Sequence, residues 1–173
     1  MANPIDTIAA KAKGMKHGME AGRDGLVGVF RTLAKEHAEA KELFERIRSD
    51  AEKAATLWPK LRDALVPHEK GELRAVYPRL AQFPELKAIC AEHQREADAL
   101  EKQILAIDAM SPGTANWAAK LDALAADVVE HATREENEFF PVAQRAIGEK
   151  LAKELDDAFA TAEKQVKASL AKH

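Results

Sequence analysis

Apolar residues recur along this chain at three- and four-residue spacing, which is the period of an α-helix. Convincing two-residue alternation, the pattern of a half-buried strand, is missing from the sequence. Together with the proline and glycine breaks, the spacing predicts four long helices with short connections, over residues 25–50, 59–77, 85–109 and 114–146. Such helices pack most simply as an up-down antiparallel four-helix bundle with the apolar stripes inward, so we expect an all-α fold.

Prolines fall inside the expected helices as well as between them. Pro59 suits the first turn of the second helix, because the missing N–H is not needed there. Pro67 lies inside the same helix, so we expect a kink or local irregularity immediately before His68. Pro141 is expected to disturb the last turns of the fourth helix, and Gly148 to end that helix.

Two segments flank the expected bundle of residues 25–147. Residues 1–24 are rich in alanine, lysine and glycine, and this N-terminal extension is expected to be helical or mobile. Residues 148–173 are expected to form an amphipathic C-terminal helix, which either covers the bundle or offers a surface to a homo-oligomer or protein partner. Its apolar stripe consists of Leu151, Leu155, Phe159, Ala162, Val166 and Leu170.

Composition and charge narrow the class of protein. Hydrophobic residues make up 46% of the 173 positions and charged residues 32%, a mix that suits one folded globular core rather than a disordered chain. The net charge of −3 gives no electrostatic case for binding nucleic acid. An apolar run long enough for a membrane span or a signal peptide is missing, and the lone Cys90 suits a reducing compartment. We therefore expect a cytoplasmic protein.

Two segments of the chain share one pattern. "HEKGELRAVYP" starts at His68 and "HATREENEFFP" at His131, and each has Glu at plus four, an aromatic residue at plus nine and Pro at plus ten. A histidine and a glutamate four residues apart stand one turn apart on the same helix face. Leucine or valine residues three and seven positions earlier share that face, so it is the buried one. Imidazoles and carboxylates are costly there unless they are hydrogen-bonded, paired or metal-bound.

The other two helices each carry one histidine, so the order His, His-x-x-x-Glu occurs twice and indicates a duplicated helix pair. Four imidazoles and two carboxylates suit first-row transition metals rather than calcium or magnesium, and the same set accepts iron, zinc or manganese. The alternative is four core histidines satisfied by polar neighbours. The predicted metal ligands are His37, His68, Glu72, His93, His131 and Glu135.

This layout, with Tyr77-Pro78 and Phe140-Pro141 closing the two units, resembles the hemerythrin-like, or HHE cation-binding, family over roughly residues 25–147. The resemblance implies an up-down bundle around two iron ions (Fe²⁺/Fe³⁺) bridged by an oxo or hydroxo group. It implies that the four histidines are terminal iron ligands and that the two glutamates bridge the ions.

The chain departs from the invertebrate oxygen carriers of that family at two places. Those proteins have a second histidine one turn after the third-helix histidine, where this chain has Ala97. Their last carboxylate is an aspartate at plus five, whereas this chain has Glu135 at plus four and Glu136 at plus five. The four-His, two-Glu set is more similar to the bacterial and eukaryotic members tied to oxygen, redox, iron or stress sensing.

Three functions share such a site. The first is binding or sensing of dioxygen, nitric oxide, another small diatomic or peroxide ligand, or redox state. The second is an enzyme that reduces peroxide or nitric oxide or oxidises ferrous iron, and the third is iron delivery or storage. A metal-free structural bundle is the remaining interpretation.

Several further residues are assigned to supporting positions. Glu69, Glu136 and Glu138 are interpreted as solvated charges or as groups that orient ligating imidazoles, not as ligands. Tyr77 is assigned to core packing, with a hydrogen bond near the metal as the alternative. Cys90 is assigned as a buried, inert thiol. His17 and His173 are assigned to the surface.

Overall fold

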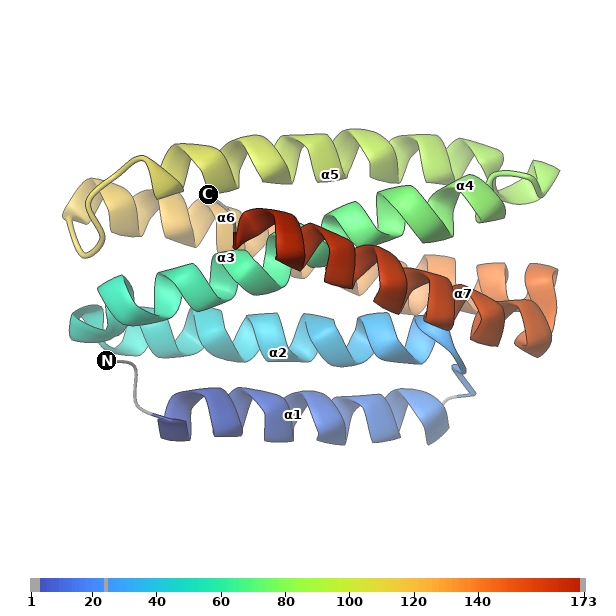
Figure 1. Ribbon diagram of the computed structural model, residues 1–173, viewed down its shortest axis with the longest axis horizontal. Coiled ribbons are helices and arrows are strands. Elements are labelled where there is room, and N and C mark those ends of the chain that lie inside the picture. Colours follow the sequence, from blue (N-terminus) through green and yellow to red (C-terminus); the bar gives the residue numbers. More distant parts are fainter. Residues whose placement is uncertain (1–3, 24, 172–173) are drawn as a thin grey trace.

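The computed structural model describes residues 4–23 and 25–171, and every regular element in these ranges is helical. The long helices are α1 (Pro4–Arg23), α2 (Val29–Ser49), α3 (Ala54–Gly71), α5 (Lys87–Asp108), α6 (Ala115–Arg134) and α7 (Phe140–Leu170). The short elements are the 3-10 turns η1 (Ala51–Lys53) and η3 (Pro84–Leu86), the π turns η2 (Glu72–Val76) and η4 (Glu135–Phe139), and the helix α4 (Tyr77–Leu80). Helices α2, α3, α5 and α6 form the bundle, with α1 along the outer side of α2 (Figure 1), so the all-α prediction is confirmed.

The bundle core is divided into two apolar clusters. One cluster gathers Phe44, Trp58, Leu61, Ile104 and Trp117 with their neighbours. The other cluster includes Phe30, Leu33, Leu80, Phe139, Phe140 and Phe159. Along α2 and α5, and along α3 and α6 continued through their π turns, the buried histidines fall between residues of the two clusters, so a polar layer crosses the bundle between two apolar ends.

The second bundle helix differs from the sequence prediction. It begins at Ala54, so Pro59 lies inside it and not in its first turn, and it also runs through Pro67. The expected irregularity immediately before His68 is wrong, because the irregularity follows that histidine as the π turn η2.

Each π turn has the same cause. Pro78 has no N–H and its ring would clash with a carbonyl four residues earlier, so the helix widens by one residue just before it. The Tyr77 N–H accordingly donates to the Glu72 carbonyl, five residues back. The second unit repeats this arrangement before Pro141, where the Phe140 N–H donates to the Glu135 carbonyl.

Helix α7 reverses the chain at Gly148, whose φ of 75° favours glycine. Residues 149–170 then run back across the bundle against α3 (Figure 1). Most of the predicted apolar stripe is buried there, including Leu155, Phe159 and Val166. The stripe therefore packs within the chain.

Helix α1 packs on α2 through the buried small residues Ala10, Gly14 and Gly18, with ion pairs beside them. Lys13 Nζ lies 2.7 Å from Glu42 Oε2 and 3.1 Å from Glu45 Oε2, and Ala10 is a buried apolar residue of this helix. Met15 and Met19 are exposed on its outer side. None of the helices described is long and apolar enough to cross a membrane.

Candidate metal centre

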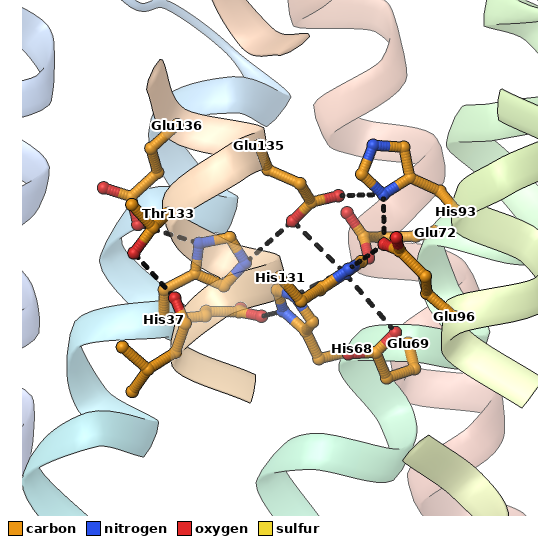
Figure 2. A network of polar contacts seen from close by, with 12 residues as sticks. His37, His68, Glu69, Glu72, His93, Glu96, His131, Thr133, Glu135 and Glu136 are labelled. Atoms are coloured by element: carbon orange, nitrogen blue, oxygen red, sulfur yellow. Dashed lines mark hydrogen bonds and ion pairs between the residues drawn. The ribbon is translucent and has the colours of Figure 1, made fainter. Parts of the chain in front are cut away.

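The six predicted ligand side chains meet in the middle of the bundle (Figure 2). The histidines come one each from α2, α3, α5 and α6, and the two glutamates each open a π turn. Each of the six residues is at most 5% exposed: His37, His68, Glu72, His93, His131 and Glu135. The repeated sequence pattern thus places the same local irregularity at both carboxylates, and single π turns of this kind are frequent at functional sites.

Most ligand atoms of this cluster point at one another without hydrogen bonds; Glu135 Oε1, which accepts one from the Tyr77 hydroxyl, is an exception. Neither oxygen of Glu72 and neither ring nitrogen of His93 has a hydrogen-bond partner in the described part of the chain, and the same holds for Nε2 of His37, His68 and His131. His37 Nε2 lies 3.2 Å from Glu135 Oε2, too poorly aligned for a hydrogen bond. An unpaired buried polar group costs about 1–3 kcal/mol, so this many in one place call for a ligand.

The donor atoms fall into two groups that suit two metal ions. His93, His131 and Glu135 form one group and His68, Glu69 and Glu72 the other, with donor atoms within 4.8 Å of one another in each. Nitrogen and carboxylate donors in this ratio fit iron, manganese or zinc.

Three carboxylates outside the two groups contact the Nδ1 atoms of the imidazoles, on the side of each ring away from the centre. Glu136, Glu36 and Glu96 each place an oxygen 2.9 Å from Nδ1 of His37, His68 and His131, respectively. A proton on Nδ1 then bonds the carboxylate and leaves the Nε2 lone pair facing the centre, the usual arrangement of metal-bound histidine. His93 differs, because its Nδ1 lies 3.7 Å from Glu135 Oε1 and 3.4 Å from Glu96.

Sequence reasoning missed part of this arrangement. Glu69 is only 6% exposed, and its Oε2 lies 3.9 Å from His131 Nε2 without a hydrogen-bond partner among the described residues. It therefore joins the candidate ligands. Glu36 and Glu96 were not singled out; Glu96 stands three residues after His93, a spacing that puts it on a neighbouring position of the same helix face.

Burial and neighbouring charges shift the pKa values of three residues of this cluster. Burial alone would raise the pKa of Glu135, but the imidazoles of His131 and His37 outweigh it and hold that pKa well below its usual range. Burial and the carboxylates of Glu135 and Glu69 raise the pKa of Glu72 well above its usual range. The pKa of His37 is raised to about 9, because the nearby carboxylates of Glu135 and Glu136 outweigh its burial. Metal binding would therefore release protons from Glu72 and His37, whereas Glu135 is already ionised.

Aromatic rings close the centre on one side. The Tyr77 hydroxyl donates a hydrogen bond to Glu135 Oε1, and its ring stacks on His93 with the centroids 5.5 Å apart. Phe139 also stacks on His93, at 5.0 Å. Tyr77 therefore contacts two candidate ligands, in line with the alternative role suggested by the sequence.

Burial raises the pKa of Cys90 to about 11, which keeps this thiol protonated and unreactive.

One histidine predicted to lie at the surface contacts the centre indirectly. His17 of α1 is partly buried, and its Nε2 lies 2.7 Å from Glu136 Oε2, the carboxylate that also bonds His37. The structure thus links α1 to a candidate ligand through one carboxylate. His173 lies outside the described residues.

Fold and site together define a helical bundle with a buried cluster of histidine and carboxylate side chains, the donor types that bind transition metals. The chain matches the hemerythrin HHE cation binding domain over residues 28–143, more than half of its length. It therefore belongs to the hemerythrin HHE cation-binding family. No curated protein and no solved structure matches the chain. Helix α1 and residues 149–170 lie outside the matched region.

Proposed function

We propose that this protein holds two iron ions and uses them to bind or sense dioxygen, nitric oxide or redox state. The observation that carries the proposal is the set of buried donor atoms in two adjacent groups, whose hydrogen-bonding capacity a metal pair would satisfy. The family's cation-binding character supports it. The bound iron would supply the redox chemistry and the affinity for small molecules.

Each side chain has a separate task in this proposal. His37, His68, His93 and His131 would hold the ions through ring nitrogens, and Glu72 and Glu135 would hold them through their carboxylates. Glu69 is an additional ligand on the side of His68 and Glu72. The carboxylates of Glu36, Glu96 and Glu136 hold the Nδ1 protons and thereby fix the imidazole orientation.

The surroundings favour binding of a small molecule in a dry site. Tyr77, Phe139 and Phe140 are each 4% exposed or less and contact the imidazoles of the centre. They exclude water from this side and so strengthen the electrostatic interactions within the site. The Tyr77 hydroxyl holds Glu135 in place through their hydrogen bond.

The test is to mix reduced, iron-loaded protein with dioxygen and with nitric oxide while the absorption spectrum is followed. A spectral change that reverses when the gas is removed supports binding or sensing. Irreversible oxidation with turnover of peroxide or nitric oxide would indicate an enzyme, and loss of iron to a metal-free acceptor would indicate delivery. Glu135→Gln should abolish the response, whereas Glu138→Gln, an exposed carboxylate of the same π turn, should preserve it.

A further inference from the structure

A cavity of ≈ 90 Å³ lies between α2, α3, α6 and the returning part of α7. Its outer end is marked by Lys167, whose side chain is 50% exposed, and its inner end by His68, at 6%. The cavity therefore connects the surface beside α7 with the polar layer of the bundle. Its charged and imidazole lining consists of Glu36, Glu39, Glu69, Glu163, Lys167, His37, His68 and His131.

The charge of this lining favours a cation. Four carboxylates face one ammonium group, and the histidines act as neutral donors when they bind metal. Glu39 Oε1 has no hydrogen-bond partner within the described residues, and Lys35 Nζ lies 3.6 Å from it. At the outer end, Glu163 is paired with Lys167.

The inner end of the cavity presents unpaired donor atoms. His68 Nε2 and Glu69 Oε2 find no hydrogen-bond partner in the described chain, and both residues are more than nine-tenths buried. An ion that passes Glu163 and Glu39 would thus arrive at one of the two candidate ligand groups.

We propose that this cavity is the route by which ferrous iron, a hydrated divalent cation, enters and leaves the metal centre. Glu163 and Glu39 attract the ion at the outer end, and Lys167 weakens that attraction. The inference rests on the proposed function, since it takes iron to be the bound metal. Glu163 and Lys167 lie outside residues 28–143, so the outer end of the route is built by the chain's own C-terminal segment.

The close packing of Phe159 against His68 and Gly71 of α3 fixes the position of the C-terminal segment. Phe159 of α7 lies edge-on to the His68 ring, with the centroids 6.0 Å apart. A Cβ at Gly71 would lie 2.7 Å from Phe159 Cε2, so glycine is required for this packing. The wall that carries Glu163 is therefore anchored on the helix of a candidate ligand.

The test is the rate at which metal-free full-length protein takes up Fe²⁺ under anaerobic conditions, measured by rapid mixing and quenching with a ferrous chelator. Glu163→Gln should slow uptake by about fivefold, and Lys167→Gln should accelerate it by a similar factor, as expected for electrostatic steering. Both effects should shrink at high salt. Glu39→Gln, on a different helix, should also slow uptake, and Glu154→Gln, exposed on α7, should leave it unchanged.

The outcomes separate the route from the function. All variants are expected to reach the iron content of the unmodified protein, because the substituted residues are not ligands. Equal rates in all variants would overturn the route, and so would changes of the same sign in Glu163→Gln and Lys167→Gln, which would indicate a structural clamp. If the unmodified protein takes up no iron, the proposed function fails, and the route with it.

Discussion

Replacing Glu72 by methionine separates the effect of this carboxylate on the metal-free fold from its effect as a ligand. Glu72 is 0% exposed, and neither oxygen has a hydrogen-bond partner among the described residues. Burial and the carboxylates of Glu135 and Glu69 raise its pKa, so the side chain is held in its protonated form, and its unpaired buried oxygens destabilise the metal-free protein. Methionine is similar in length and has no oxygen, so the metal-free variant should be more stable by about 1–3 kcal/mol.

With iron bound, the sign of the effect reverses. An ion that binds only the folded protein stabilises it by about 4 kcal/mol at a thousandfold excess over its Kd. Glu72→Met removes the carboxylate from the group that it forms with His68 and Glu69. The variant should therefore lose most of this stabilisation for at least one of the two ions.

Urea unfolding with and without Fe²⁺ under anaerobic conditions measures both effects. Glu154→Met, at an exposed position of α7, controls for the introduced methionine. A metal-free Glu72→Met protein several kcal/mol less stable than the wild type would refute the reasoning about the unpaired carboxylate. An unchanged iron-dependent gain in stability would refute its assignment as a ligand.

Three further changes test other parts of the account. Gly71→Ala should destabilise the protein by about 1–3 kcal/mol in urea unfolding, because its Cβ would clash with Phe159. Glu36→Gln should weaken iron binding about 10- to 100-fold in an anaerobic titration, whereas the exposed Glu45→Gln should not. Because the pKa of His37 is raised from 6.5 to about 9, its contribution to stability is complete below pH 6.5 and is lost as the pH rises towards 9. Metal-free protein should therefore unfold more easily at pH 9 than at pH 6.5, and a flat urea midpoint over this range would contradict that assignment.

The bundle and the meeting of the histidines could be predicted because both depend on spacing within single helices. The three- and four-residue periods define the buried faces, and a histidine with a glutamate at plus four occupies one face wherever the helix lies. The predicted break at Gly148 likewise follows from one residue, whose φ of 75° the structure shows.

The features that were not predicted depend on contacts between helices. Glu36 neighbours His37 in sequence but bonds His68 on the next helix, and no spacing rule connects those two residues. Burial of Glu69 follows from the helices packed around α3 and not from its own neighbours in sequence. The π turn after His68 arises from Pro78, ten residues downstream, whereas sequence reasoning considered only the nearer Pro67.

The most direct test of the central claim is the iron content of the protein after anaerobic loading with Fe²⁺ and removal of excess metal, determined by elemental analysis. The account predicts about two iron ions per chain, one for each ligand group. The Glu72→Met and Glu135→Gln variants should each retain less. A chain that retains no iron, or variants that retain as much iron as the unmodified protein, would contradict the account.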